Sequence, residues 1–149
     1  MIGLLQRVKS AEVRVDGECI ASIGHGMLVL IGIERKDGDR QVQRLADRLL
    51  NYRVFPDTAG KMNYNILQTS GSMLLVPQFT LAADTSQGNR PSFSRAADPA
   101  SAKVLFCALV ARVGQELTNV EIGHFGSEMA VSLINDGPVT FSLQVPPDM

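Results

Sequence analysis

A chain of 149 residues fits a single domain, because a domain of this size can bury roughly 70% of its unfolded surface. The composition, 45% hydrophobic and 19% charged, is that of an ordinary globular protein and excludes a disordered chain. The formal net charge of −1 argues against a nucleic-acid partner, since phosphate binding requires clustered Lys and Arg.

The charges are unevenly distributed along the chain, which weakens that objection. All 14 Lys and Arg residues lie at or before Arg112, together with 10 of the Asp and Glu residues, so this part carries 14 − 10 = +4. The remainder carries acidic residues only. Because both parts belong to one fold, the asymmetry permits a nucleic-acid partner without indicating one.

The start of the chain and its two cysteines indicate a cytosolic protein. Met1 to Val8 lack the charged start and long apolar core of a signal peptide, and no apolar run approaches the roughly 18 residues that span a bilayer. Cys19 and Cys107 stand far apart without Cys-x-x-Cys spacing, so we expect two reduced, buried thiols and no disulfide or metal pair. We expect no membrane partner.

The N-terminal part alternates between apolar and polar residues as half-buried strands do. The apolar stretches are Leu4 to Val8, Val13 to Val15, Ile20 to Ile23 and Met27 to Ile33. Asp16-Gly17 is a two-residue hairpin signal, and Gly24-His25-Gly26 indicates a second tight turn. Such short connections predict an antiparallel sheet.

Two helices are predicted further along the chain. A capping cluster at Asp37 to Asp39 precedes apolar residues at helical spacing, namely Val42, Leu45, Ala46, Leu49 and Leu50. Asp98-Pro99 starts the second helix, which we expect to end near Gly114. Its expected apolar face consists of Val104, Leu105, Ala108 and Leu109.

The remaining segments complete a single α+β domain over residues 1–145, with a loose tail at residues 146–149. Pro56 to Asn65 is expected to be a polar loop, and Ala82 to Arg95 a long loop of the kind that is often functional. The other expected strands are Val54-Phe55, Met73 to Val76, Met129 to Ile134 and Val139 to Val145.

Common catalytic signatures are absent from the sequence. We find no Gly-x-Ser-x-Gly, His-Glu-x-x-His, phosphate-loop or dinucleotide motif. With only His25 and His124, a metal site would need unusual ligands, so we expect no metal. No motif places a base beside a Ser or Cys nucleophile.

Two segments are physically unusual. In Pro77-Gln78-Phe79-Thr80-Leu81 a strand meets a long loop, where backbone amides become free to bind a ligand. The alternative, which the sequence alone favours, is a strand end with Phe79 in the core. In Asn135-Asp136-Gly137-Pro138 the Asp-Gly favours a hairpin, but the following Pro cannot donate to a ladder. The alternative there is an ordinary turn.

These segments belong to a longer series of motifs. The series comprises Gln6-Arg7-Val8, Gly26 to Gly32, Lys61-Met62-Asn63 with Asn65, Gln78 to Asp84, Arg90 to Ser94, Val131 to Leu133 and Asn135 to Phe141. It resembles the successive signatures of the D-aminoacyl-tRNA deacylases from Met1 to about Val145. These enzymes hydrolyse the ester between a D-amino acid and the 3′ end of tRNA.

The resemblance implies a homodimer with a barrel-like sheet and two active sites near the subunit interface. Gln78, Phe79 and Thr80 of one subunit would be catalytic, with Phe79 supporting the terminal adenosine. Gly137 and Pro138, joined by a cis peptide, would reach in from the other subunit and reject L-aminoacyl esters, while glycyl-tRNA mischarged on tRNA-Ala would pass. Arg7 and Met129 match positions near that loop. No cofactor, metal or DNA partner is implied.

Pro77 departs from the family, where Ser is common, so a Ser-based mechanism is in doubt. An aminoacyl ester is already activated, so hydrolysis needs placed water and oxyanion stabilisation more than a strong nucleophile. The family suggests that the 2′-hydroxyl of the tRNA positions the water, and Thr80 as covalent nucleophile is the alternative. Two other readings stay open: an inactive tRNA-binding module, and an enzyme for glycyl or mischarged L-aminoacyl tRNA.

Overall fold

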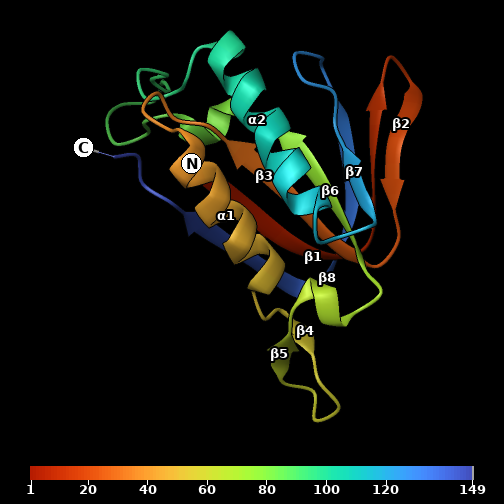
Figure 1. The fold of residues 1–149 in the computed structure, drawn as a ribbon. Coiled ribbons are helices and arrows are strands. Elements are labelled where there is room, and N and C mark those ends of the chain that lie inside the picture. Colours follow the sequence, from red (N-terminus) through yellow and green to blue (C-terminus); the bar gives the residue numbers. More distant parts are fainter. Residues whose placement is uncertain (149) are drawn as a thin grey trace.

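The 14-residue strand β1 (Ile2–Val15) organises the sheet of the computed structural model, which describes residues 1–148 (Figure 1). Along one edge, β1 pairs antiparallel with β2 (Glu18–Ile23) and then with β3 (Gly26–Gly32). Along its other edge it pairs antiparallel with β8 (Ala130–Gln144). One long strand therefore supports three others.

The two turns expected early in the chain have different outcomes. Asp16 and Gly17 both have positive φ, 50° and 80°, and close the β1–β2 hairpin as predicted. Gly24-His25 does not reverse the chain, because β2 and β3 pair with consecutive parts of the same edge of β1, with Ala11 opposite Ile23 and Val8 opposite Gly26. The prediction of a tight turn there was wrong. Gly24 and Gly26 only interrupt one extended run of chain, from Glu18 to Gly32, that follows this edge of β1.

The rest of the sheet is parallel, so the expected mainly antiparallel sheet is a mixed one. β6 (Ser72–Pro77) pairs parallel with β3, and β7 (Val120–Ile122) pairs parallel with β6. Both links are long crossovers that carry a helix, which parallel neighbours require. The alternation of apolar and polar residues near the N-terminus, which predicted the antiparallel sheet, does not indicate these crossovers. The sheet is nearly closed and barrel-like, and β7 was not predicted.

A separate ribbon lies below the main sheet in Figure 1, at the end of α1. It consists of β4 (Phe55–Pro56) and β5 (Met62–Tyr64), which pair antiparallel. The segment Pro56 to Asn65, predicted to be only a loop, therefore contains a strand. A 3-10 turn, η1 (Ile66–Gln68), follows and leads to β6.

The helices α1 (Asp39–Asn51) and α2 (Pro99–Gly114) lie side by side over one face of the sheet (Figure 1). Asp98 caps α2 by accepting a hydrogen bond from the Ser101 amide, 3.0 Å away, as its sequence predicts. Val104 is 68% exposed, so its expected place on the apolar face was wrong. Phe106 and Val113 take that role, with Ala102 and Leu109.

Alternating residues of β3 and β6 face two different cores. Met27, Val29 and Ile31 pack toward the helices, whereas Leu28 packs on the opposite side, inside the curved sheet. Met73 and Leu74 divide in the same way on β6. Because these central strands are buried on both faces, they read as continuous apolar runs. This packing fixes the end of β6, where the candidate site begins.

The two cysteines are free, as predicted, but both are exposed, so the expectation of buried thiols was wrong. Among residues 1–148, no helix is long and apolar enough to cross a membrane.

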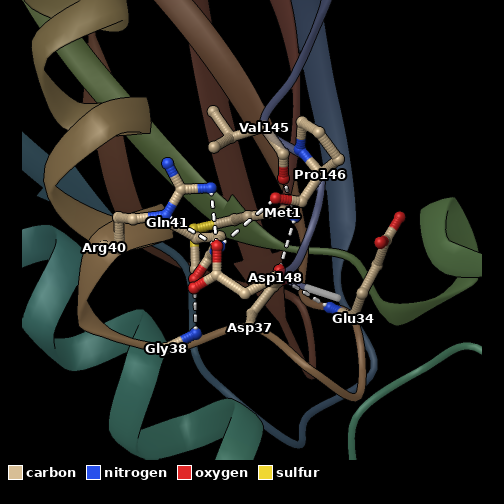
Figure 2. Close-up of polar contacts among 9 residues, drawn as sticks. All are labelled: Met1, Glu34, Asp37, Gly38, Arg40, Gln41, Val145, Pro146 and Asp148. Atoms are coloured by element: carbon tan, nitrogen blue, oxygen red, sulfur yellow. Dashed lines mark hydrogen bonds and ion pairs between the residues drawn. The ribbon is translucent and has the colours of Figure 1, made fainter.

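Buried charges join the first residue to the chain near residue 145 (Figure 2). The Met1 ammonium donates to Asp37 Oδ1 at 2.8 Å and to the Val145 carbonyl oxygen at 2.7 Å. The Met1 and Asp37 side chains are fully buried. Beyond Val145, Asp148 pairs with Arg40 at 2.7 Å. The loose tail expected at residues 146–149 stays a prediction, and Met149 lies outside the described residues.

Candidate functional site

The candidate site begins where β6 leaves the sheet. The Gln78 amide still donates to the Ile31 carbonyl of β3, at 2.8 Å. On the opposite edge of β6, Pro77 has no N–H to donate. The last hydrogen bond between β6 and the segment after β7 is donated by the Gly123 amide to the Leu75 carbonyl, at 2.8 Å. The two segments diverge beyond this point, and the gap between them opens as a cavity.

The cavity has a volume of about 520 Å³, within the range of small-ligand sites. Its walls come from the ends of β3 and β6, residues 78–79 and 93–97, the start of α2 and the segment 125–129. They are mainly apolar and include Ile31, Pro77, Phe79, Phe93, Phe125 and Met129. An apolar cavity lined by aromatic rings suits a flat, partly apolar group such as a nucleobase.

Phe79 is 63% exposed at the cavity, so the alternative that places it in the core was wrong. Its ring lies 5.2 Å from the ring of Phe93, centroid to centroid, tilted by 50°. Phe93 belongs to the long loop predicted at residues 82–95. It was not predicted as a site residue, although an apolar residue in the middle of a polar loop is a signal that could have identified it.

The loop that carries Phe93 is held by polar contacts. Asp84 and Ser92 exchange backbone hydrogen bonds of 2.7 and 3.0 Å, and the Asp84 carboxylate lies 3.5 Å from Arg95. Hydrogen bonds from the side chain and then the backbone of Ser86, together with the Arg95 charge, lower the pKa of the Asp84 carboxyl. The carboxylate therefore stays ionised to a lower pH than usual, and the two backbone bonds hold the base of the loop.

The segment after Pro77 forms a short 3-10 turn, η2 (Phe79–Ala82), with Gln78 as its first flanking residue. Within the described chain, the amides of Phe79 and Thr80 have no hydrogen-bond acceptor, as expected for the first turn of a helix. The Gln78 side-chain amide donates to Thr80 Oγ1. Among residues 1–148, no Asp, Glu or His side chain bonds to this hydroxyl, so it lacks a base that would activate it.

The second expected segment is an interruption within one strand. β8 runs continuously from Ala130 to Gln144, where two strands and a turn were predicted. Its pairing with β1 shifts, because Gln6 lies opposite Thr140 while Val8 lies opposite Asn135. Residues 136–139 therefore bulge out of the ladder opposite Arg7. The peptide bond between Gly137 and Pro138 is cis, which confirms that prediction.

Arg7 fills the space beneath this bulge. Its Nε donates to the Asp136 carbonyl oxygen at 2.9 Å and its Nη1 to the Val54 carbonyl oxygen at 2.5 Å. Gly137 has φ of +144°, and a Cβ there would lie 2.6 Å from Val139 Cγ2, so only glycine fits. The exposed pair Gly137 and Pro138 is thus held by contacts beneath it.

Asn135 closes the base of the bulge, a role that sequence reasoning missed. Its Oδ1 accepts from the Val139 amide at 2.6 Å, and its Nδ2 donates to Thr140 Oγ1 at 2.9 Å. Asn is one of the few residues that can bond to nearby backbone in both directions. The signal available in the sequence was an Asn four residues before a Val-Thr pair.

The expected site residues form two groups within one subunit. Gln78, Phe79 and Met129 line the cavity, with Thr80 beside them on η2. Arg7 lies with the Gly137-Pro138 bulge instead, and neither residue of that pair lines the cavity. The supporting residues Arg7 and Met129 therefore belong to different groups. One chain by itself does not bring the two groups into one cavity.

The two histidines contact an aromatic ring and a hydroxyl group. The His25 ring lies 5.2 Å from the Phe55 ring, and His124 Nδ1 contacts Ser127 Oγ. In the part of the chain that the structure describes, no three His, Cys, Asp or Glu side chains gather as metal ligands would.

Comparison with known proteins gives a consistent picture. A family model described as D-Tyr-tRNA(Tyr) deacylase matches residues 4–144. A protein of Methylococcus capsulatus named D-aminoacyl-tRNA deacylase is 55% identical over 148 residues, which cover 99% of this chain and 97% of the relative. One of Escherichia coli O1:K1 with the same name is 52% identical over 145 residues, covering 97% and 100%.

Two solved structures are similar in fold. The c-Myc DNA Unwinding Element Binding Protein superposes with a TM-score of 0.94 at 34% identity, covering 98% of this chain and 99% of that one. A probable eukaryotic D-amino acid tRNA deacylase superposes with a TM-score of 0.81 at 14% identity, covering 95% and 98%. The second comparison supports the shared fold alone. The family resemblance seen in the motifs is confirmed.

Proposed function

The chain belongs to the D-Tyr-tRNA(Tyr) deacylase family, and we propose that its active site combines the cavity of one subunit with the Gly137-Pro138 bulge of a second copy. The chain is a hydrolase that cleaves the ester of D-aminoacyl-tRNA to a free D-amino acid and tRNA. The observation that carries the composite site is that the two groups of site residues do not share a cavity within one subunit.

The terminal adenosine of the tRNA enters the apolar cavity and stacks on Phe79. Its exposed ring and the neighbouring Phe93 ring support this placement, because single-stranded RNA ends are commonly held by aromatic stacking. Met129, on the wall of the same cavity, contributes an adaptable apolar surface. The aminoacyl ester attached to that adenosine then lies near the start of η2.

Hydrolysis proceeds by attack of water on the ester carbonyl, with the 2′-hydroxyl of the tRNA positioning the water. The amides of Phe79 and Thr80, which have no acceptor within residues 1–148, stabilise the oxyanion that forms. Collapse of this intermediate breaks the bond to the ribose oxygen, which takes up the proton released by the attacking water. Thr80 acts through its backbone, since its hydroxyl accepts from Gln78 and has no adjacent base.

Chiral selection resides in the exposed Gly137-Pro138 pair of the second copy. Its backbone occupies the side of the substrate's α-carbon where an L-residue would carry its side chain, so L-aminoacyl esters are excluded. Glycine has no side chain, and glycyl-tRNA mischarged on tRNA-Ala is therefore a substrate. The contacts of Arg7 and Asn135 beneath the bulge support this proposal, because a barrier must be held in place.

A homodimer is required by this arrangement. Apolar side chains on β8 flank the bulge and are exposed in the single chain, Ile134 at 57% and Phe141 at 36%. Exposed large apolar residues on both sides of a functional segment favour a protein–protein contact. We propose that β8 of each subunit lies at the interface and presents its bulge to the neighbouring cavity.

The composite site can be tested by complementation between two variants that each lack selective deacylation. Phe79→Ala damages the cavity and Pro138→Ala damages the bulge, so each variant alone should lose selective D-tyrosyl-tRNA deacylation. After the two are unfolded together and refolded, each mixed dimer contains one site with both wild-type elements. Hydrolysis of D-tyrosyl-tRNA with rejection of L-tyrosyl-tRNA should return in the purified mixed dimers. Absence of recovery, with mixed dimers demonstrated by mass spectrometry, would contradict the composite site.

A further inference from the structure

Four basic residues lie on the segments that wall the cavity, and we propose that they bind phosphates of the single-stranded 3′ end of tRNA. They are Arg35, Lys36, Arg90 and Lys103, here called the basic rim. All four are exposed, and among residues 1–148 none lies within 4.0 Å of a carboxylate oxygen. The inference rests on the proposed function, because it identifies how that substrate is held.

Arg35 and Lys36 are presented by a fixed turn. Asp37, inside the fold, accepts from the Met1 ammonium with one oxygen and from the Glu34 amide, 2.7 Å away, with the other (Figure 2). The Asp37 amide donates back to the Glu34 carbonyl at 3.0 Å. The turn is thus closed from both ends while its two middle side chains face solvent. A fixed backbone reduces the entropy lost when these cations bind an anion.

The same turn is joined to the wall of the cavity. The Arg35 amide donates to the Arg95 carbonyl at 2.8 Å, and the Ala97 amide donates to the Ile33 carbonyl at 3.0 Å. Ile33 and Ala97 both line the cavity. Arg35 therefore lies two residues after Ile33, which is on one wall, and its amide is hydrogen-bonded to the segment that carries Ala97 on the neighbouring wall.

Lys103 and Arg90 extend the rim along the other walls. Ala102 lines the cavity from α2, and Lys103 is the next residue on the same helix. Arg90 precedes Phe93 by three residues in the loop whose base is held by the Asp84–Ser92 hydrogen bonds. Cations thus lie beside three of the segments that line the cavity, where the phosphates preceding a bound terminal nucleotide would lie, whereas segment 125–129 carries none.

Most nearby acidic groups are already engaged. Asp84 faces Arg95, Asp98 caps α2, and Asp37 is paired with the Met1 ammonium. Glu34 and Glu128 have no basic partner within the described chain, so they reduce the positive field without neutralising it. We therefore expect a few phosphates to be bound and a moderate salt dependence. The rim also explains how a chain of net charge −1 can bind tRNA.

The test compares two esters that share the reacting group and differ in phosphates. D-tyrosyl-tRNA carries the phosphates, whereas D-tyrosyl-adenosine carries none. The variants are Arg35→Gln/Lys36→Gln, Arg90→Gln, Lys103→Gln and all four changes together. The matched control is Arg44→Gln/Arg53→Gln, which removes two exposed cations on and just after α1.

The fourfold variant should lower kcat/KM for D-tyrosyl-tRNA on the order of 10-fold at low salt, with D-tyrosyl-adenosine unchanged. Its plot of log kcat/KM against log salt should flatten by about 0.7 for each phosphate that is no longer neutralised, while the control keeps the wild-type slope. An unchanged slope, or equal decreases on both esters, would overturn the basic rim. If the unaltered chain hydrolyses neither ester, the proposed function itself fails.

Discussion

The guanidinium of Arg7 on β1 donates to the Asp136 carbonyl oxygen on β8, 2.9 Å away, at the point where the ladder between these strands is interrupted. The same side chain reaches the Val54 carbonyl, so it joins the bulge to the segment that follows α1. Arg7 is largely buried, with 11% of its side chain exposed. The position of Gly137-Pro138 therefore depends on an arginine fork that a lysine cannot reproduce.

We predict that Arg7→Lys folds but loses chiral selection, because the bulge that excludes L-esters is no longer held. A single ammonium cannot span both carbonyls, and hydrogen bonds to a charged group are worth about 1.5–3 kcal/mol, which corresponds to roughly a 10- to 100-fold decrease in the ratio of D-ester to L-ester kcat/KM. The matched control is Arg14→Lys, an exposed position on the same strand. Deacylation kinetics and thermal unfolding check both variants. Unchanged selectivity for the D-ester in Arg7→Lys would show that the arginine fork is dispensable.

Thr80→Ala should keep substantial activity, whereas Phe79→Ala should lose much more. The Thr80 hydroxyl has no base beside it among the described residues, while the exposed Phe79 ring has no core to stabilise and is available for the adenosine. Single-turnover deacylation of D-tyrosyl-tRNA measures the difference. The assignment fails if Thr80→Ala is inactive although it folds and binds tRNA.

Pro77→Ser should retain the fold. The lost ring and regained N–H lie on the side of β6 that β7 has already left, and the Gln78 bond to Ile31 is unaffected. We expect a change of no more than a few degrees in Tm, as for a half-buried position that loses no hydrogen bond. Failure of this variant to fold would show that Pro77 has become structurally required.

Asp37→Asn should destabilise the protein. It leaves the buried Met1 ammonium without its countercharge, and removal of one partner from a buried pair costs roughly 3 kcal/mol. Asp39→Asn, at the exposed first turn of α1, is the control and should change stability far less. Urea unfolding at constant pH measures both free energies. Equal stabilities would contradict the role given to the Asp37 pair.

Local signals in the sequence predicted local structure well. Asp16-Gly17 has backbone requirements of its own, and Asp98-Pro99 starts a helix through its nearest neighbours. The parallel pairing of β6 with β3 was not predictable in this way, because it joins residues 46 positions apart (72 − 26 = 46) through a long crossover. The prediction that Val104 lies on the apolar face was wrong for a related reason, since helical spacing alone does not say which face of the helix the sheet will cover.

The candidate site was predicted only in part. The residue pattern alone favoured a core position for Phe79, because the exposure of this ring at the cavity depends on where β7 diverges from β6, which a local pattern does not show. The family resemblance corrected this expectation. Phe93 and Asn135 were missed although each had a local signal in the sequence, and the basic rim was missed because its residues lie far apart along the chain. The two expected groups of site residues are present, but the partner subunit that would unite them stays a proposal.

The most direct test of the whole account is deacylation of matched D-tyrosyl-tRNA and L-tyrosyl-tRNA by the purified protein. We predict rapid release of D-tyrosine and an L-tyrosyl ester that decays no faster than it does without enzyme. Hydrolysis of both esters at similar rates, or of the L-ester alone, would contradict chiral selection by the Gly137-Pro138 bulge.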